Sequence, residues 1–188
     1  MKTYGRDEIE NFLLVIDENL SERFDLIIIG GTAAALAYHV TSFTKDIDTV
    51  NNIAAIQKAY EAAKKKTGLE IPMGRVGVED GPHHYPDRLL EHVISGAKHL
   101  KVFVPERHDF VLMKMIRGQQ NDLETVVEMH KAEPLSFDRL LELIVSEMTA
   151  ITGNKRRIKP NFLNMFETLF GETTLAVAEG RLKVWELS

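Results

Sequence analysis

The sequence contains no cysteine, which excludes disulfide bonds, thiolate metal sites and a cysteine nucleophile. It also lacks any apolar run that approaches the ~20 residues a membrane-spanning helix needs. Residues 1–8 do not resemble the apolar core of a signal peptide. We therefore expect a cytoplasmic protein without a membrane partner.

An excess of positive charge is lacking as well. The chain carries 23 Lys and Arg against 28 Asp and Glu, a net charge of −5, so its overall field does not favour polyanions. Contact with a nucleic acid would have to come from a local basic patch, and the one cluster is Lys155–Lys159. A solvated loop is the favoured interpretation of this cluster, and an RNA contact is the alternative.

The remaining composition is that of a soluble globular protein with enough apolar material for a sizeable core: 188 residues, 44% hydrophobic and 27% charged. Helical and strand patterns alternate in the first half of the chain, and only helical patterns follow. We predict helices over 6–20, 32–40, 53–66, 107–117, 122–131, 137–151 and 160–171, and strands over 24–29, 46–50, 89–94 and 100–104. Residues 70–86, rich in proline and glycine, are expected to be mostly loop, and 175–187 is ambiguous.

This pattern predicts an α+β (mixed α/β) fold in two parts. Residues 1–105 would form an α/β core and residues 106–188 a helical region. The join is short, so a core shared by the two parts is left open.

The most informative stretch begins with an apolar run, Phe24–Ile29, that ends at Gly30-Gly31-Thr32. The run is typical of a buried strand, and an alanine-rich helix follows. A glycine pair lets the backbone approach a ligand closely, and the N–H groups that start a helix favour an anion. Taken alone, the glycine pair favours an ordinary strand-to-helix turn.

Asp46 and Asp48 lie on the next predicted strand, separated by one residue, so both should point to the same face of the sheet. Two neighbouring carboxylates are unfavourable unless a cation lies between them. They could be exposed acids on an edge strand, but with the glycine pair a site for Mg²⁺ or Mn²⁺ is favoured. A glycine turn for a triphosphate beside two metal-binding carboxylates suits phosphoryl transfer.

Two motifs of this stretch resemble the signature of the polymerase-β-like nucleotidyltransferase superfamily, Ile29-Gly30-Gly31-Thr32 and Thr44-Lys45-Asp46-Ile47-Asp48. A second stretch, Glu106–Glu124, is similar to a helix–break–helix element of a bacterial branch. That branch contains the AbiEii-like toxins and a group of small, uncharacterised nucleotidyltransferase-like proteins. The resemblance covers about residues 25–132 and implies a small mixed sheet flanked by helices, with the helical region completing the cleft.

The resemblance also implies roles for individual residues. The triphosphate would contact Gly30, Gly31, Thr32, Thr44 and Lys114, the metal would bind Asp46 and Asp48, and Asp122 would be a further polar member of the site. A lysine in this position is most often a solvated or snorkelling helix residue, and Asp122 has an alternative role as a helix N-terminal acid.

The superfamily often has a third carboxylate that acts as general base. Glu91, which has apolar neighbours, is the first candidate in this sequence, followed by Asp87 and Glu79.

The first functional hypothesis is therefore an enzyme. It would transfer NMP from an NTP to an RNA end, such as that of tRNA, or to a protein side chain. The branch implies a toxin role with an antitoxin as partner. The alternative hypothesis is a catalytically weak or inactive protein of the same fold that binds nucleotide or regulates a partner.

Overall fold

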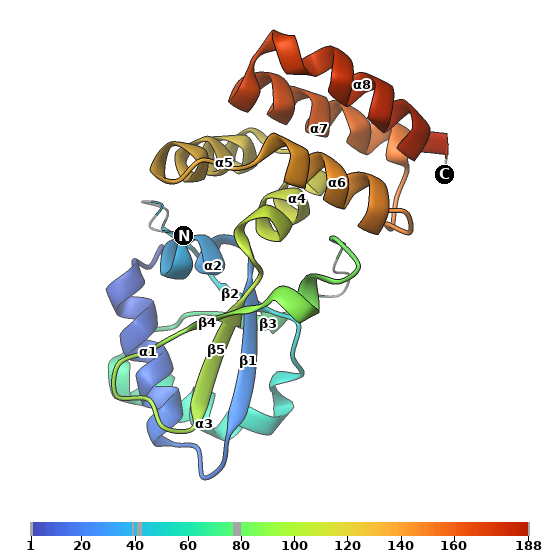
Figure 1. The fold of residues 1–188 in the computed structure, drawn as a ribbon. Helices are drawn as coiled ribbons and strands as arrows, with labels where there is room; N and C mark the ends of the chain where they lie inside the picture. The colour runs from blue at the N-terminus through green and yellow to red at the C-terminus, as the bar shows by residue number, and fades with distance from the viewer. Residues whose placement is uncertain (1, 39, 41–42, 77–79, 188) are drawn as a thin grey trace. The chain divides into compact units, whose positions relative to one another are not determined.

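The computed structural model describes residues 2–38, 40, 43–76 and 80–187 (Figure 1). The chain forms two compact units. The first comprises Met1–Gly77 and Leu89–Pro105, and the second comprises Val78–Arg88 and Glu106–Ser188. The segment 78–88 thus belongs to the second unit, although it precedes the boundary that the sequence suggests at residue 105.

The first unit is built on a mixed five-stranded sheet with the order β3-β2-β1-β5-β4. β1 runs parallel to β5 and antiparallel to β2, β2 runs parallel to β3, and β4 runs antiparallel to β5. The strands are β1 (Phe24–Ile29), β2 (Ile47–Thr49), β3 (Met73–Arg75), β4 (Leu90–His92) and β5 (Leu100–Val104). The mixed α+β architecture predicted from the sequence is confirmed.

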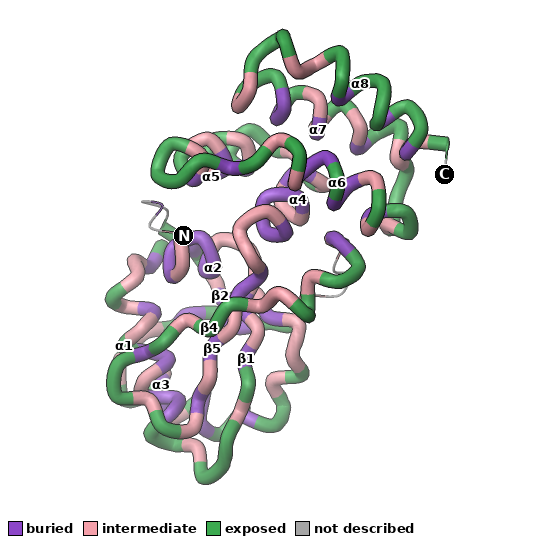
Figure 2. Tube along the Cα trace, viewed as in Figure 1, coloured by how far each residue is buried: buried purple, intermediate pink, exposed green. Residues whose placement is uncertain are grey.

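Helices pack on one face of this sheet. Buried and half-buried positions alternate along β1 and β5, as expected when one face is covered, and the buried ones appear purple in Figure 2. His92, which is paired with the buried Val102, lies 3.0 Å from Glu10 of α1, so α1 covers this face. The helices of the unit are α1 (Arg6–Glu18), α2 (Gly30–Ala37) and α3 (Gln57–Thr67), which follows the short 3₁₀ turn η1 (Ile53–Ile56).

A buried carboxylate joins α1 to the start of β5. Asp17 is only 3% exposed, and it accepts hydrogen bonds from the backbone N–H groups of Lys98, His99 and Leu100 at 2.6 to 3.0 Å. Burial acts to raise the pKa of Asp17, but these donors hold it below its ordinary value. Asp17 therefore fixes the loop that enters β5.

The second unit is helical and packs around aromatic side chains. Phe162 and Trp185 are buried with their ring centroids 5.7 Å apart, and the Trp185 indole N–H donates to the carbonyl of Met148. Its elements are the 3₁₀ turn η2 (Tyr85–Arg88) and the helices α4 (Arg107–Arg117), α5 (Gln120–Ala132), α6 (Phe137–Glu147), α7 (Lys155–Phe170) and α8 (Glu172–Leu187). Within the described residues, no helix is both long and apolar enough to cross a bilayer.

The largest differences from the sequence prediction concern three elements. β3 lies in the stretch expected to be loop, because three residues are too short to show a strand pattern. The last predicted helix starts at Lys155 rather than Pro160, because the Asn154 side chain caps it by accepting from the N–H of Arg156. The basic cluster is therefore helix rather than loop. The ambiguous C-terminal stretch is the regular helix α8.

Candidate functional site

The turn between β1 and α2 requires glycine at its first position. α2 begins at Gly30 itself rather than at Thr32, and Gly30 has a φ of +65°. A Cβ atom at Gly30 would lie 2.8 Å from Oδ2 of Asp48, so a side chain there would require the carboxylate to move. The antiparallel register pairs Ile29 with Asp48, so the two predicted motifs meet at this turn.

Two threonine hydroxyls hold the backbone just before β2. Thr32 Oγ1 donates to the carbonyl of Asp46 at 2.6 Å, and Thr44 Oγ1 donates to the same oxygen at 3.0 Å. Both threonines are buried, and a Cβ at Gly31 would lie 3.0 Å from Thr44 Oγ1. Hydroxyls that donate to Asp46 cannot donate to a phosphate with the same proton. Thr32 and Thr44 therefore hold the backbone at Asp46, and their expected contact with a triphosphate stays a prediction.

Asp46 directly precedes β2, and Asp48 is the middle residue of that strand. Both are half-buried and alternate with Ile47 and Thr49, which are fully buried. The alternation directs the two carboxylates to one face, away from the packed side. Mg²⁺ is usually bound by one or two carboxylates together with substrate phosphates and water, so this pair beside a tight glycine turn suits such an ion.

Glu91 is not brought together with these aspartates. It lies on β4, three strands away from β2 in the sheet, which corresponds to about 14 Å at the usual strand spacing. Its Oε1 atom pairs with Nζ of Lys101 at 2.7 Å. On the two strands next to β2, the residues paired with Asp48 are Ile29 and Gly74, and neither of them is an acid.

For the two lower-ranked candidates, a role as the third acid stays a prediction. Asp87 belongs to η2 in the second unit and lies 3.4 Å from His84, and Glu79 falls outside the described residues. In the part of the chain that the structure describes, no three Asp, Glu or His side chains form a metal-binding group.

Lys114 and Asp122 contact each other within the second unit. Asp122 is fully buried and accepts from Lys114 Nζ at 3.2 Å, from Arg117 at 2.6 and 2.8 Å, and from the backbone N–H of Gln119. Burial acts to raise the pKa of Asp122, but the bonds and charges of Arg117 and Lys114 hold it below its ordinary value. The roles expected for Lys114 and Asp122 toward a nucleotide stay predictions.

Asp122 also serves as a helix cap. α5 begins at Gln120 rather than at Asp122, and Gln119 and Asp122 form its capping box. Arg117 was missed in the sequence because its distance from Asp122 depends on how the chain turns between α4 and α5.

A second buried ion cluster was also missed. Arg88 makes two bonds to Asp109, at 2.8 and 2.9 Å, and two to Glu147, at 2.7 and 2.9 Å. Asp109 is fully buried, and burial raises its pKa in spite of the Arg88 charge. The cluster ties the segment around η2 to α4 and α6, which explains why this segment belongs to the second unit.

The basic cluster of α7 is engaged with α8. Lys155 Nζ donates to the carbonyl of Trp185 and lies 5.3 Å from the centre of its ring. Lys159 and Arg156 pair with Glu186 at 2.9 and 3.2 Å. These contacts give the cluster a role in helix packing, and they weaken the RNA-contact alternative because Glu186 offsets part of the charge.

Comparison with known proteins supports the resemblance at the family level. Residues 8–170 match the model of a family described as nucleotidyltransferase of unknown function (DUF6036). That description does not name the AbiEii branch. Neither the curated proteins nor the solved structures provide a match. The match spans most of the chain, including the Gly30 turn and both aspartates, and the chain therefore belongs to the DUF6036 family of nucleotidyltransferases.

Proposed function

We propose that this protein is a metal-dependent nucleotidyltransferase that transfers NMP from an NTP to an RNA or protein acceptor. The observation that carries the proposal is the position of the Asp48 carboxylate against the Gly30 turn, where Oδ2 would lie 2.8 Å from an added Cβ atom. In a chain of a nucleotidyltransferase family, this is where a triphosphate and a cation would bind together.

In the proposed reaction an acceptor hydroxyl oxygen forms a bond to the α-phosphorus. The bond from that phosphorus to the α–β bridging oxygen breaks, pyrophosphate leaves, and the hydroxyl proton passes to a base or to solvent. Asp46 and Asp48 would hold Mg²⁺ or Mn²⁺, which when bound supplies charge neutralisation for the phosphates. The N–H groups of Gly31 and Thr32, in the first turn of α2, have no intrahelical partners and would receive the triphosphate.

The alternative function is nucleotide binding without efficient transfer. Its support is that no third acid joins Asp46 and Asp48 within the described residues. A site with two carboxylates can still hold Mg²⁺ with a nucleotide, but it lacks an evident general base.

Transfer of label from each α-labelled NTP distinguishes the two functions. Wild-type protein would be incubated with Mg²⁺ or Mn²⁺ and with total tRNA or cell extract. We expect labelled RNA or protein with the wild type, and at least a hundredfold less with Asp48→Asn, since the ion would lose a ligand. Asp25→Asn is the matched control, because Asp25 lies on β1 and its carboxylate pairs with the exposed Arg23.

Tight calorimetric binding of ATP or GTP without any label transfer would favour the alternative. Equal transfer by the wild type and Asp48→Asn would contradict both.

The resemblance to the AbiEii-like branch further suggests a cytoplasmic toxin held in check by an antitoxin. We expect induced expression in a bacterial host to arrest growth, and Asp48→Asn to abolish the arrest while accumulating to the same level. Growth arrest that persists in Asp48→Asn would contradict a toxin role for this chemistry.

A further inference from the structure

The strand that carries Asp48 is short. β2 has three residues, and its register with β1 pairs Ile28 with Thr49 and Ile29 with Asp48. A slip of one residue in this register would turn every side chain of β2 to the other face of the sheet, and the Asp48 carboxylate would leave the Gly30 turn. The position of Asp48 therefore depends on how the two ends of β2 are held.

The first end of β2 is held by the two threonine hydroxyls that donate to the Asp46 carbonyl. At the other end the regular pairing with β1 stops. In the continued register Ile27 faces Val50, and the N–H of Val50 still donates to the Ile27 carbonyl, at 3.4 Å. In a regular antiparallel pair the Ile27 N–H would donate back to Val50. Here it donates to a side chain instead.

That side chain is the half-buried Asn51. Its Oδ1 accepts from the backbone N–H of Ile27 at 2.7 Å, and its Nδ2 donates to the backbone carbonyl of Asp25 at 3.0 Å. One amide group thus pairs with a donor and an acceptor of β1, as a peptide group of a neighbouring strand would. An ionised carboxylate could make only the first of these bonds, and an apolar side chain neither.

Thr49 connects Asn51 to the strand. It is fully buried, and its Oγ1 donates to the carbonyl of Ile27 at 2.7 Å and accepts from the N–H of Asn51 at 3.1 Å. Because Thr49 directly follows Asp48, the contacts of Asn51 act on the residue next to the carboxylate.

We propose that Asn51 is a positioning residue for the metal–nucleotide site: its amide fixes β2 against β1 and so holds the Asp48 carboxylate at the Gly30 turn. The role of Asn51 toward a metal rests on the proposed function. Its role toward Asp48 rests on the hydrogen bonds alone, so the two can be tested separately.

The next residue offers a matched control. Asn52 is exposed, and its side chain accepts from the N–H of Ala54 as the cap of η1. Asn51→Ala and Asn52→Ala each remove an amide that bonds to the backbone. A change that follows merely from a weakened fold should therefore appear in both variants, whereas a change in the position of Asp48 should appear only in Asn51→Ala.

A double-mutant cycle measured by urea unfolding tests the position of Asp48 without metal or nucleotide. Gly30→Ala should cost more unfolding free energy than Gly68→Ala, because the added Cβ displaces the Asp48 carboxylate. Once β2 is loosened the carboxylate can move more easily, so Asn51→Ala should reduce this excess by at least half. Asn52→Ala should leave the excess unchanged. The same excess in both backgrounds would overturn the proposal.

A second variant covers the case in which Asn51→Ala does not fold. Asn51→Asp keeps an acceptor for the Ile27 N–H and loses only the donor to the Asp25 carbonyl. The same reduction of the excess is expected, and an unchanged excess would again overturn the proposal.

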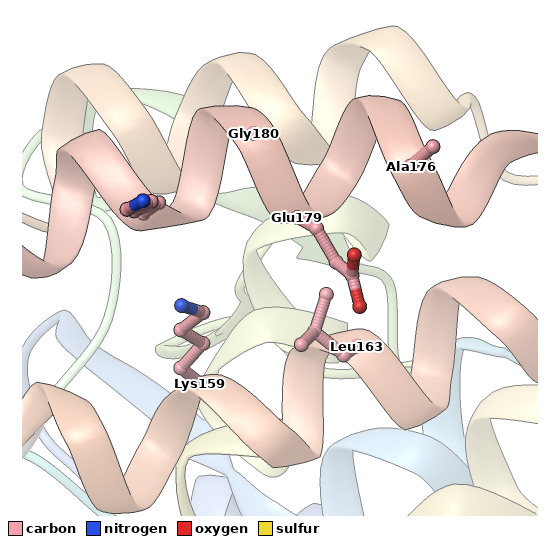
Figure 3. Close-up of a pocket in the computed structure, with 6 residues that line it drawn as sticks. Lys159, Leu163, Ala176, Glu179 and Gly180 are labelled. Atoms are coloured by element: carbon pink, nitrogen blue, oxygen red, sulfur yellow. The ribbon is translucent and has the colours of Figure 1, made fainter.

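Mn²⁺ binding in the presence of a non-hydrolysable ATP analogue tests the role toward the metal. We expect about tenfold weaker binding by Asn51→Ala, the loss typical of a residue that orients a metal ligand, and wild-type affinity for Asn52→Ala. Glu179→Gln controls for ions held elsewhere, because Glu179 lines a pocket of about 400 Å³ between α7 and α8, together with Lys159 and Leu163 (Figure 3). It should bind Mn²⁺ as the wild type does.

The outcomes separate this proposal from the proposed function. Wild-type Mn²⁺ affinity in Asn51→Ala would overturn the positioning role toward the metal. A wild type without saturable Mn²⁺ binding would contradict the proposed function itself, whereas the double-mutant cycle would still show whether Asn51 holds Asp48 at the turn.

Discussion

At the scale of single residues, the candidate site depends on the absence of a side chain at Gly30. The left-handed φ and the 2.8 Å approach of Asp48 act at the same position, so any replacement must strain the backbone and displace a carboxylate. Gly68 offers a natural comparison, because it has a φ of +69° but no atom within 4 Å of an added Cβ.

Gly30→Ala should therefore cost more stability than Gly68→Ala. The left-handed conformation costs about 1 kcal/mol in either variant, and Gly30→Ala adds the clash with Asp48. Urea unfolding of both variants gives the comparison, and the same loss in the two would show that Asp48 does not constrain this turn.

The local part of the site could be predicted from the sequence, and the rest could not. Alternation along a strand placed Asp46 and Asp48 on one face, and the glycine pair marked the turn that meets them. The assignment of Glu91 depended on strand order, which the sequence does not reveal. The Arg88 and Arg117 contacts were missed because their carboxylate partners come within reach of these long side chains only in the folded chain.

At the scale of secondary-structure elements, buried carboxylates join segments that are distant in sequence. β1 and β5 matched their predicted bounds because each is a mostly apolar run that is followed by glycine or proline. The buried carboxylates show no comparable pattern in the sequence, since Asp17 and Leu100 are 83 residues apart. Two predictions concern the contacts of these buried carboxylates.

Asp17→Asn should reduce stability at neutral pH and have less effect in acid. The folded-state pKa of Asp17 lies below its unfolded value of about 3.9, so its contribution is complete above that value. It is lost as pH falls through the folded-state pKa. Urea unfolding of the wild type and the variant from pH 7 to pH 3 measures the difference. A difference that stays constant over this range would contradict the role of the ionised carboxylate.

Arg88→Leu should loosen the segment around η2 from α4 and α6. Removing the guanidinium leaves Asp109 buried without its partner, which costs about 3 kcal/mol. Limited proteolysis should then cleave near residues 80–88 faster than in the wild type. Arg23→Leu, which removes an exposed ion pair with Asp25, is the control and should change little. Similar cleavage in all three proteins would show that the cluster does not hold this segment.

At the scale of the whole molecule, the overall negative charge and the proposed chemistry are compatible because the nucleotide site is local. A net charge of −5 does not attract a triphosphate, so binding must come from a cation and from backbone N–H groups. Nucleotide affinity should therefore depend strongly on a divalent ion, whether the protein transfers NMP or only binds the nucleotide.

The most direct test of the central claim measures the binding of Mn²⁺ by electron paramagnetic resonance in the presence of a non-hydrolysable ATP analogue. The account predicts saturable Mn²⁺ binding by the wild type and by Asp25→Asn, and at least tenfold weaker binding by Asp46→Asn and by Asp48→Asn. Equal Mn²⁺ affinity in all four proteins would contradict a metal–nucleotide site at these two aspartates.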